Sequence, residues 1–590
     1  MTSGGDDDGR RGGLPVADKP WPPPAPMEKV RWRRALLVGG LMALLAFFVL
    51  GRESASTVLE IASAKLTAMN NGAGFMFMNA SHGHAAGAAG ATAMAADELL
   101  GGLLAPGMDP SSCLSRYQMS RYFKHFPYAP SPYLLAKLRA YEARHRRCAP
   151  GTPLYAKAVE QLRSGVSAAG AGAMECQYIV WLPFDGLGNR MLSMASGFLY
   201  ALLTGRVLLA AIPPDSANLF CEPFPNTTWL LPPDFPVANL LRLGPRPDVS
   251  YTRLLTKKKI VVDTAGNPPA SNATAEAPPP VPAYVYLSLG WQMTDGPFFC
   301  GEHQRALAGV NWLLLYSDLY FAPSLYTIAG FHGELRRLFP AREATSHLLL
   351  RYLLHPANPV WGLVTRFYHS YLSPATRRVG VQIRMASYDI VPAADKYNQI
   401  LACSRQEHNI LPETTGDGDD DAAPPPMMTN GGAGNNVSTA ILIASLYGDY
   451  YERLRSRYYE HAATGGGVWV GVFQPTHEER QATEEAAHNR RALAEIYLLS
   501  FSEELVTSGI STFGYVGSSL AGVRPAILLP AHGHKVPATP CRRAVSMEPC
   551  NLTPPRGVTC RPAAKAVDGE DVARHLKVCE DWEKGVKLFD

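Results

Sequence analysis

The sequence predicts an α/β fold, because short apolar segments typical of strands alternate with amphipathic helices in two separate parts of the chain. The first part contains a strand over residues 178–182, a glycine-rich turn, a helix over 191–203 and a strand over 207–212. The second part contains the apolar segment 379–383 and, further on, the run from His488 to Tyr515. We therefore expect two α/β units, each with a sheet of its own.

Composition favours a globular protein of more than one domain. The chain has 590 residues, of which 47% are hydrophobic and 9% aromatic, enough for two sizeable cores. The formal net charge is only +4, and the Lys and Arg residues are scattered. This charge pattern argues against nucleic acid as a partner and leaves small or neutral substrates open.

An apolar run over residues 35–51 follows four basic residues close to the N-terminus. We interpret it as a transmembrane helix, with a cleaved signal peptide as the alternative. Basic residues before the span place residues 1–34 in the cytosol and everything after the span in the lumen. Residues 52–98, rich in Gly and Ala towards their end, are expected to form a flexible stem.

Cysteine usage agrees with a lumenal location. All ten cysteines, from Cys113 to Cys579, lie beyond the apolar run, and their even number predicts disulfides. Four of them lie in the last 50 residues and are expected to staple the C-terminal tail to the body. Five N-glycosylation sequons lie on the same side and give weaker support, at Asn79, Asn226, Asn272, Asn436 and Asn551.

The turn Asp185 to Arg190 joins the first predicted strand to its helix. Its glycines would let the backbone approach a ligand, and the N-terminus of the following helix favours negative charge. The spacing GLGN is not the dinucleotide-binding fingerprint, so a purely structural turn remains the alternative.

Arg384 follows the apolar strand 379–383 directly. Open α/β sheets bind ligands at the carboxyl ends of their strands, and a guanidinium grips phosphate with two donors. The alternative is a salt bridge at the end of a strand. Beyond it, residues 439–459 are predicted to be helical and residues 468–473 to form a strand.

The run His488 to Tyr515 predicts a helix over 489–500 that carries Glu495, and a strand over 505–507. Hydroxyl and glycine residues then form a turn before a second helix, which could offer amides and hydroxyls to an anion. The alternative is an ordinary helix, strand and turn of an α/β domain.

Two segments of biased composition, 265–282 and 413–436, are interpreted as surface insertions. The second contains Asp417 and Asp419, an acidic pair of the type that holds a divalent ion in some nucleotide-sugar enzymes. Because this pair lies in a low-complexity insertion rather than at a strand end, we expect no metal site there.

Many motifs in one consistent order resemble the plant xyloglucan α-1,2-fucosyltransferases of glycosyltransferase family 37. The resemblance runs from about Leu99 to the C-terminus through SCLSRYQ, KLRAYEARHRRC, DGLGNRMLSMASGFLYALLTGRVLL, FFCGEHQ, YSDLYFAPSLY, RYLLHPANPVWGLVTRFY, GVQIR, HNRRALAEIYLLS, STFGYVGSSLAG, SMEPC and HLKVCEDWEKGVKLFD. The two insertions have no counterpart in the family pattern.

The resemblance implies a type II Golgi membrane enzyme of variant GT-B fold, with two Rossmann-like domains that face a cleft. It would use GDP-fucose, invert the anomeric centre and need no metal or other cofactor. We expect an acceptor-side domain over 99–370, a GDP-fucose-binding domain over 371–540 and a Cys-rich tail over 541–590.

It also implies roles for particular residues. Arg384 would stabilise the departing diphosphate, because GVQIR is similar to the arginine motif of other GDP-fucose enzymes. Asp318 or His355 would act as the general base. The remaining donor-site candidates are Gly188, Asn189 and Arg190, which would face the cleft, Glu495 for guanine or ribose, Ser511, Thr512, Phe513 and Gly514 for phosphates and nucleoside, and Tyr515 for stacking.

Xyloglucan is the first expectation for the acceptor, and arabinogalactan protein glycans are the alternative within the same class. A different class would be a glycan-binding or scaffold protein that keeps the fold without turnover. The motif set around Arg384 and the STFGY turn favours the enzyme.

Overall fold

The computed structural model describes residues 99–166, 174–244, 246–262, 281–385, 390–415, 438–464, 469–560 and 574–590. All of them belong to the compact unit of residues 94–590. The segments predicted as cytosolic tail, transmembrane span 35–51 and stem lie outside the described residues, as do most of the two insertions. Among the helices that are described, none is both long and apolar enough to cross a membrane.

The first sheet contains four parallel strands in the order β2-β1-β4-β3. They are β1 (Tyr178–Pro183), β2 (Val207–Ala210), β3 (Tyr284–Ser288) and β4 (Trp312–Ser317). The strand order reverses between β1 and β4, where connections to the two faces diverge and open a crevice at the carboxyl ends.

Helix α6 (Leu187–Thr204) connects β1 to β2 and is almost entirely buried. Around this sheet lie α4 (Pro132–Cys148) and α5 (Pro153–Arg163), each with Pro at its first position and a hydroxyl N-cap, from Ser131 and Thr152. The shorter helices are α3 (Leu114–Gln118), α7 (Tyr251–Thr256), α8 (Gly301–Ala308), α9 (Ala322–Leu325), α10 (His332–Leu338), η1 (Met119–Arg121), η2 (Pro214–Ser216), η3 (Leu240–Arg242), η4 (Gly296–Phe299), η5 (Ala329–Phe331) and η6 (Arg342–Ala344).

The second sheet contains six strands in the order β10-β9-β8-β5-β6-β7. They are β5 (Arg377–Ile383), β6 (Thr439–Ser445), β7 (Val470–Phe473), β8 (Glu504–Ser508), β9 (Ala526–Leu528) and the antiparallel β10 (Cys541–Arg543). The order reverses between β5 and β8. Its helices are α11 (Thr345–Leu353), α12 (Asn358–Phe367), η7 (Tyr368–Leu372), α13 (Ala393–Gln406), α14 (Asp449–Glu460), α15 (Ala486–Leu499) and α16 (Thr512–Ala521), of which α11, α12 and η7 precede β5. A C-terminal hairpin pairs β11 (Leu576–Val578) with β12 (Val586–Leu588).

The prediction of a continuous helix over 439–459 is wrong, because its first part is strand β6 and only the second part is helix α14. Every residue of β6 is buried, since the strand lies between β5 and β7 and is covered on both faces. A strand buried on both faces loses the alternation of polar and apolar residues, so its pattern is hard to distinguish from that of a buried helix.

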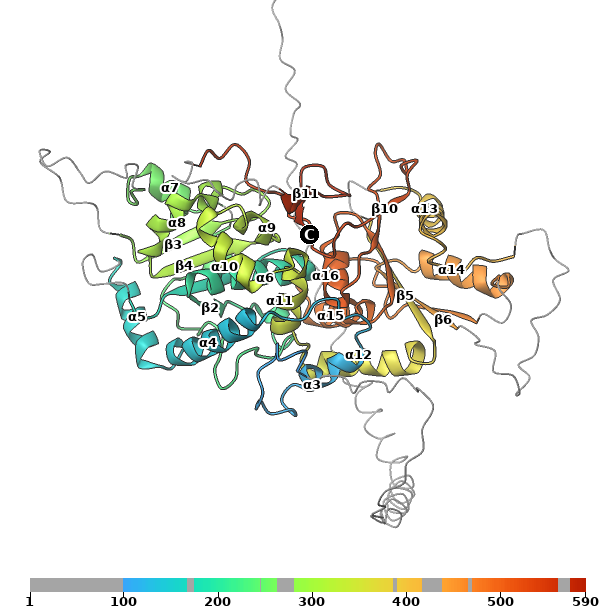
Figure 1. Ribbon diagram of the computed structural model, residues 1–590, viewed down its shortest axis with the longest axis horizontal. Coiled ribbons are helices and arrows are strands. Elements are labelled where there is room, and N and C mark those ends of the chain that lie inside the picture. The colour runs from blue at the N-terminus through green and yellow to red at the C-terminus, as the bar shows by residue number, and fades with distance from the viewer. Residues whose placement is uncertain are drawn as a thin grey trace, which may run out of the picture. The chain divides into compact units, whose positions relative to one another are not determined.

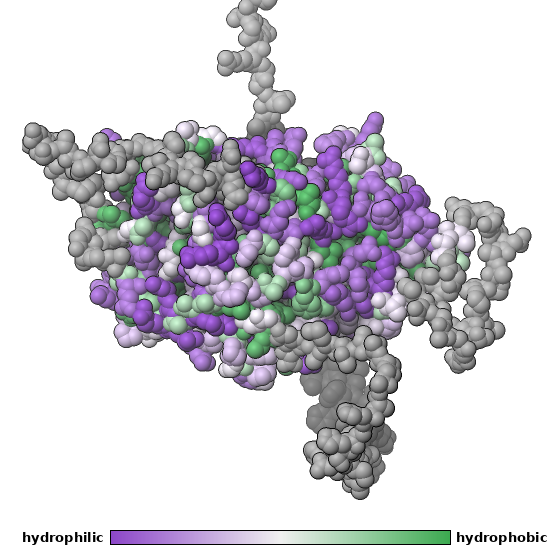
Figure 2. Space-filling view, in the orientation of Figure 1, coloured by the Kyte–Doolittle hydropathy of each residue, from purple (hydrophilic) through white to green (hydrophobic). Residues whose placement is uncertain are grey.

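Helices α6, α11, α15 and α16 pack against one another, and Figure 1 shows them between β3 and β4 on one side and β5 and β6 on the other. Their apolar side chains belong to one continuous core that reaches both sheets. On the face shown in Figure 2, hydrophilic residues cover most of the described surface and hydrophobic ones form small separate patches.

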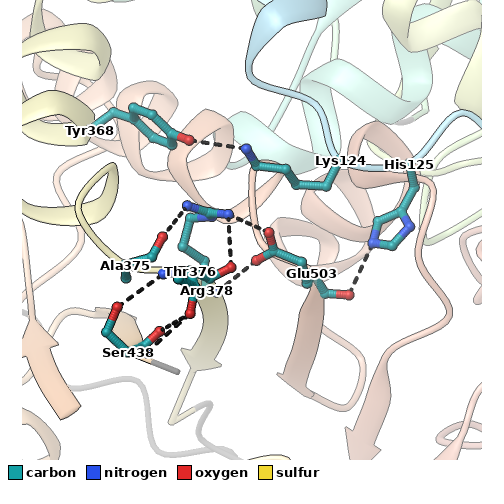
Figure 3. Close-up of polar contacts among 8 residues, drawn as sticks. All are labelled: Lys124, His125, Tyr368, Ala375, Thr376, Arg378, Ser438 and Glu503. Carbon is teal, nitrogen blue, oxygen red and sulfur yellow. Dashed lines mark hydrogen bonds and ion pairs between the residues drawn. The ribbon is translucent and has the colours of Figure 1, made fainter. Parts of the chain in front are cut away.

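A polar cluster fixes the start of β5 next to β8 (Figure 3). Glu503 accepts hydrogen bonds from the backbone N–H of Arg378 at 2.7 Å and from its guanidinium at 2.5 Å. The guanidinium also donates to the carbonyl of Ala375. His125, which lies before α4, bonds to the carbonyl of Glu503, so the N-terminal segment is tied to the second sheet.

The expected disulfides are present, and all ten cysteines are paired. The pairs are Cys113–Cys221, Cys148–Cys176, Cys300–Cys560, Cys403–Cys541 and Cys550–Cys579. Two of them connect the tail 541–590 to earlier parts of the chain, as expected for a tail that is stapled to the body.

Candidate active site

A cavity of about 600 Å³ lies where the carboxyl ends of the two sheets meet. Its walls come from the segments that follow β1 and β4 in the first sheet, and β5, β6 and β8 in the second. Helix α15 and the segment before it complete the lining. The lining residues used below are Gly188, Asn189, Trp291, Asp318, Arg384, Thr476, Glu478, Arg491, Glu495, Ile510, Thr512, Phe513 and Leu552.

Two helix N-termini, those of α6 and α16, meet at this cavity. Thr512 Oγ1 donates to Asn189 Oδ1 at 2.5 Å, and a Cβ on Gly188 would lie 2.8 Å from the carbonyl carbon of Thr512. Within the described chain, neither helix has a side-chain cap on its first N–H groups. The two positive dipole ends with uncapped N–H groups therefore suit an anion between the sheets.

Arg384 lies at the carboxyl end of β5 and is exposed to the cavity. Its backbone N–H donates to Ser508 Oγ at 2.9 Å, which ties the end of β5 to the end of β8. Among the described residues its guanidinium has no carboxylate partner, so the interpretation as a strand-end salt bridge gains no support. The free guanidinium adds a cation beside the two helix N-termini.

Glu495 on α15 is buried in the cavity wall, and burial raises the pKa of its carboxyl to about 8. Thr476 donates a hydrogen bond to Glu495, and the nearby Glu478 raises the pKa further. Glu478 itself is held by Arg491 and His488. With this pKa, the Glu495 carboxyl is mostly protonated at pH 7.

Asp318 follows β4 on the opposite side of the cavity and is buried. Its Oδ1 accepts the backbone N–H of Trp291 at 2.8 Å. Burial raises the pKa of this carboxyl, with a smaller contribution from the charge of Asp185. A carboxylate with a raised pKa is a stronger base than an exposed one, which suits proton abstraction from a hydroxyl.

His355, the second general-base candidate, does not line the cavity. It is fully buried, and burial holds the pKa of its imidazole well below the usual range. The prediction of His355 as general base is therefore corrected, because its imidazole packs in the core away from the cavity lining.

Four predicted donor-site residues also lie outside the lining. Arg190 was expected to face the cleft, but it binds Asp215 Oδ1 at 2.5 Å and Ser216 Oγ at 2.6 Å. Tyr515 is buried and donates to Asp581 Oδ2 at 2.5 Å, so its ring is not available for stacking.

The other two are Ser511, which is buried at the N-cap of α16, and Gly514. A Cβ on Gly514 would lie 2.9 Å from both Gln382 Oε1 and Thr507 Cβ. This glycine therefore lets α16 pack closely on the sheet rather than approach a ligand. Thr512 and Phe513 do line the cavity, so the predicted anion-binding turn is displaced to the first residues of α16.

Trp291, Glu478 and Arg491 are among the lining residues that sequence reasoning missed. Arg491 falls in the HNRR segment at the start of α15, one helical turn before Glu495, and that spacing was a usable signal. Trp291 follows the glycine after β3, a position at the carboxyl edge of the first sheet. Glu478 lies in an irregular segment with no pattern to mark it.

Comparison with known proteins gives one consistent result. A family model described as xyloglucan fucosyltransferase matches residues 74–561. A galactoside 2-alpha-L-fucosyltransferase of Pisum sativum is 42% identical over 497 residues, which cover 84% of this chain and 82% of that protein. The Arabidopsis thaliana protein of the same name is 43% identical, with 83% of each chain covered.

A solved structure of a mutant of Arabidopsis thaliana FUT1 in complex with GDP is 41% identical and superposes with a TM-score of 0.70. The match covers 83% of this chain and 100% of that one.

Proposed function

The chain belongs to the xyloglucan fucosyltransferase family, and we propose that it transfers L-fucose from GDP-fucose to the 2-hydroxyl of a galactose on xyloglucan. Two of its relatives are named galactoside 2-alpha-L-fucosyltransferase, and the GDP complex of the FUT1 mutant supports a GDP-linked donor. The two sheets, parallel except for the edge strand β10, have facing carboxyl ends and support a variant GT-B fold, whose donor site is formed by the second sheet.

The observation that carries this proposal is the distribution of charge across the cavity. Arg384 and the N-terminus of α16 belong to the second sheet, while the buried carboxyl of Asp318 belongs to the first. A diphosphate leaving group fits the cationic side, and an acceptor hydroxyl fits the side with the base. Because the acceptor hydroxyl would attack from one side of the fucose and GDP would leave from the other, this arrangement favours inversion of the anomeric centre.

In this mechanism the bond between fucose C1 and the β-phosphate oxygen breaks, and the bonding electrons leave with GDP. Arg384 and the uncapped N–H groups of α16 stabilise the charge that develops on the diphosphate. The acceptor O2 forms the new bond to C1, and its proton passes to Asp318 directly or through one water. The reaction needs no electron transfer, and neutralisation by Arg384 supports our expectation that no metal takes part.

Arabinogalactan protein glycans are the second candidate acceptor, because they also present galactose and the donor side of the cavity would be unchanged. Purified protein should release GDP from GDP-fucose only when a galactosyl acceptor is present, with EDTA in the buffer. Xyloglucan oligosaccharides that lack fucose are compared with arabinogalactan oligosaccharides, and the product linkage is read by NMR. Binding of either glycan without GDP release would instead identify a non-catalytic glycan-binding protein.

We further propose a single-pass type II location in the Golgi membrane, with residues 35–51 as the span. The pairing of all ten cysteines supports an oxidising compartment. Asn226 is exposed and available for glycosylation, whereas Asn551 is buried and donates to Ser324 Oγ. In sealed Golgi vesicles protease should remove residues 1–34 alone. Digestion of the catalytic part without detergent would refute the orientation.

A further inference from the structure

Trp291 is a large aromatic residue left exposed at the edge of the active-site cavity. Half of its surface, 50%, is accessible to solvent, although it lines the cavity with the buried Asp318. An exposed aromatic side chain beside a buried carboxyl in a cavity wall offers an apolar face to a bound ligand. Its location points to a ligand that enters the cavity from the side of the first sheet.

The turn that carries Trp291 is held at both ends. Asp318 accepts the backbone N–H of Trp291, and the buried Asp295 accepts the backbone N–H of Ser288 at 2.7 Å. Met293 N–H closes the turn by donating to the carbonyl of Gly290 at 2.7 Å. A Cβ on Gly290 would lie 2.7 Å from Asp318 Oδ1, so only glycine allows the carboxylate to approach this closely. The indole is thus carried on a fixed backbone.

A second tryptophan supports the first. The rings of Trp291 and Trp582 lie 6.2 Å apart, and Trp582 Nε1 donates to the carbonyl of Leu552 at 2.8 Å. Leu552 is itself part of the cavity lining. The C-terminal tail therefore places an anchored aromatic ring behind Trp291 and continues the same side of the cavity.

We propose that Trp291 is the stacking platform of the acceptor subsite, which takes a pyranose ring of the glycan on its exposed indole face. Sugars present an apolar C–H face and a rim of hydroxyls, so a ligand of this class covers the indole while a hydroxyl reaches Asp318. Because the backbone N–H of Trp291 bonds to Asp318, the platform and the base share one fixed turn. This inference rests on the proposed function, whose donor side it leaves unchanged.

The test compares Trp291→Ala and Trp291→Phe with wild type, using a galactosyl xyloglucan oligosaccharide as the probe. For Trp291→Ala we expect KM for the oligosaccharide, and its Kd by calorimetry in the presence of GDP, to rise about tenfold or more. Trp291→Phe should recover much of the loss because a smaller aromatic face remains. The Kd for GDP should stay within twofold in both, which also shows that the variants are folded.

Trp469→Ala is the matched control, since Trp469 has a similar exposure of 46% and does not line the cavity. It should leave KM and Kd for the oligosaccharide unchanged. An acceptor Kd that Trp291→Ala does not alter would overturn the subsite. The same holds if wild type fails to bind the oligosaccharide. Binding by wild type that depends on Trp291 but yields no GDP would keep the subsite and refute the proposed function instead.

Discussion

At the scale of single residues, Arg384 gives the sharpest test of the donor side. Its guanidinium faces the cavity with no carboxylate partner in the described chain. Arg384→Lys should be nearly as damaging as Arg384→Ala, with kcat/KM reduced about 10²–10³-fold, because lysine cannot present two coplanar donors to a diphosphate. Steady-state kinetics with GDP-fucose as the varied substrate measure the effect.

Whether the Arg384 variants change KM or kcat shows whether the arginine contacts the donor in the ground state or only in the transition state. A contact made in both ground and transition states raises KM for GDP-fucose, whereas a contact with the developing leaving-group charge lowers kcat. Wild-type values of both constants would show that Arg384 does not touch the donor.

Glu495 predicts a pH dependence of donor binding. Burial raises its pKa to about 8, so the carboxyl is protonated in the free protein below that pH. If it accepts hydrogen bonds from guanine N–H donors, binding must release its proton. The Kd for GDP should then fall as pH rises from 6 towards 8, up to tenfold per unit, and level off above 8.

Glu478 and Arg491 face Glu495, and Arg491 pairs with Glu478 throughout this range. Calorimetry in two buffers of different ionisation enthalpy should detect the released proton, and Glu495→Gln should remove both the release and the pH dependence. A Kd independent of pH in wild type would mean that Glu495 stays neutral in the complex and does not accept from guanine as an anion.

Some site residues could be predicted from the sequence and others could not. Arg384 and Asp318 follow strands, and the carboxyl edge of a parallel sheet fixes where such side chains lie. Arg190 and Tyr515 sit next to equally clear motifs, yet their side chains turn to Asp215 and Asp581, which are remote in the chain. Side-chain direction depends on such tertiary partners, and no local pattern contains them.

At the scale of elements, the approach of α6 and α16 defines the anion site. Gly188→Ala would place a methyl group 2.8 Å from Thr512, and backbone atoms there cannot yield without moving one helix. We expect Kd for GDP to rise about tenfold or more and unfolding stability to fall by about 1–3 kcal/mol from overpacking. Calorimetry and denaturant unfolding measure the two effects.

Gly301→Ala provides the control for Gly188→Ala. Gly301 is also in the first turn of a helix, α8, but a Cβ there would meet nothing within 4 Å. Its GDP affinity should equal that of wild type. Unchanged GDP affinity in Gly188→Ala would mean that the contact between the two helices does not shape the anion site.

Burial alone did not decide which elements were predicted, because strands β1 and β5 and helix α6 are as buried as the strand that was missed. The strands over 178–182 and 379–383 and the helices at 191–203 and 489–500 were found with shifted ends. The helices begin three to four residues earlier than predicted, at Leu187 and Ala486, because their first turns contain no periodic apolar residues. Strand β6 was missed because its buried apolar run has no polar alternation and only three residues separate it from helix α14, so the two were predicted as one helix.

At the scale of the whole molecule, the C-terminal tail connects the two halves. Asp581 accepts hydrogen bonds from the backbone N–H of Ile510, at 2.7 Å, and from Tyr515. Ile510 lines the cavity and has a positive φ of 55°, a strained conformation that an external partner must hold. The sequence predicted a stapled tail from its cysteines, but which pairs form depends on tertiary approach and could not be derived from spacing.

The disulfide Cys550–Cys579 lies two residues from Asp581 and should therefore control the site as well as stability. It closes a loop of 29 residues, and Cys148–Cys176 closes one of 28. Because the loops match, replacing either pair by serines should cost a similar chain-entropy contribution, roughly 3–4 kcal/mol. Only the variant Cys550→Ser with Cys579→Ser should also loosen Asp581, release the segment around Ile510 and weaken GDP binding severalfold.

Denaturant unfolding and GDP calorimetry on both double variants separate the two contributions. We expect both double variants to lose the same amount of stability. Only the Cys550→Ser/Cys579→Ser variant should also bind GDP more weakly. Asp581→Ala should reproduce the loss of GDP affinity with both disulfides intact, because it removes the single oxygen, Oδ2, that accepts from both Ile510 N–H and Tyr515. GDP binding that survives loss of the Cys550–Cys579 bond would show that the cavity segment is held by α16 alone. The tail would then stabilise the fold without shaping the site.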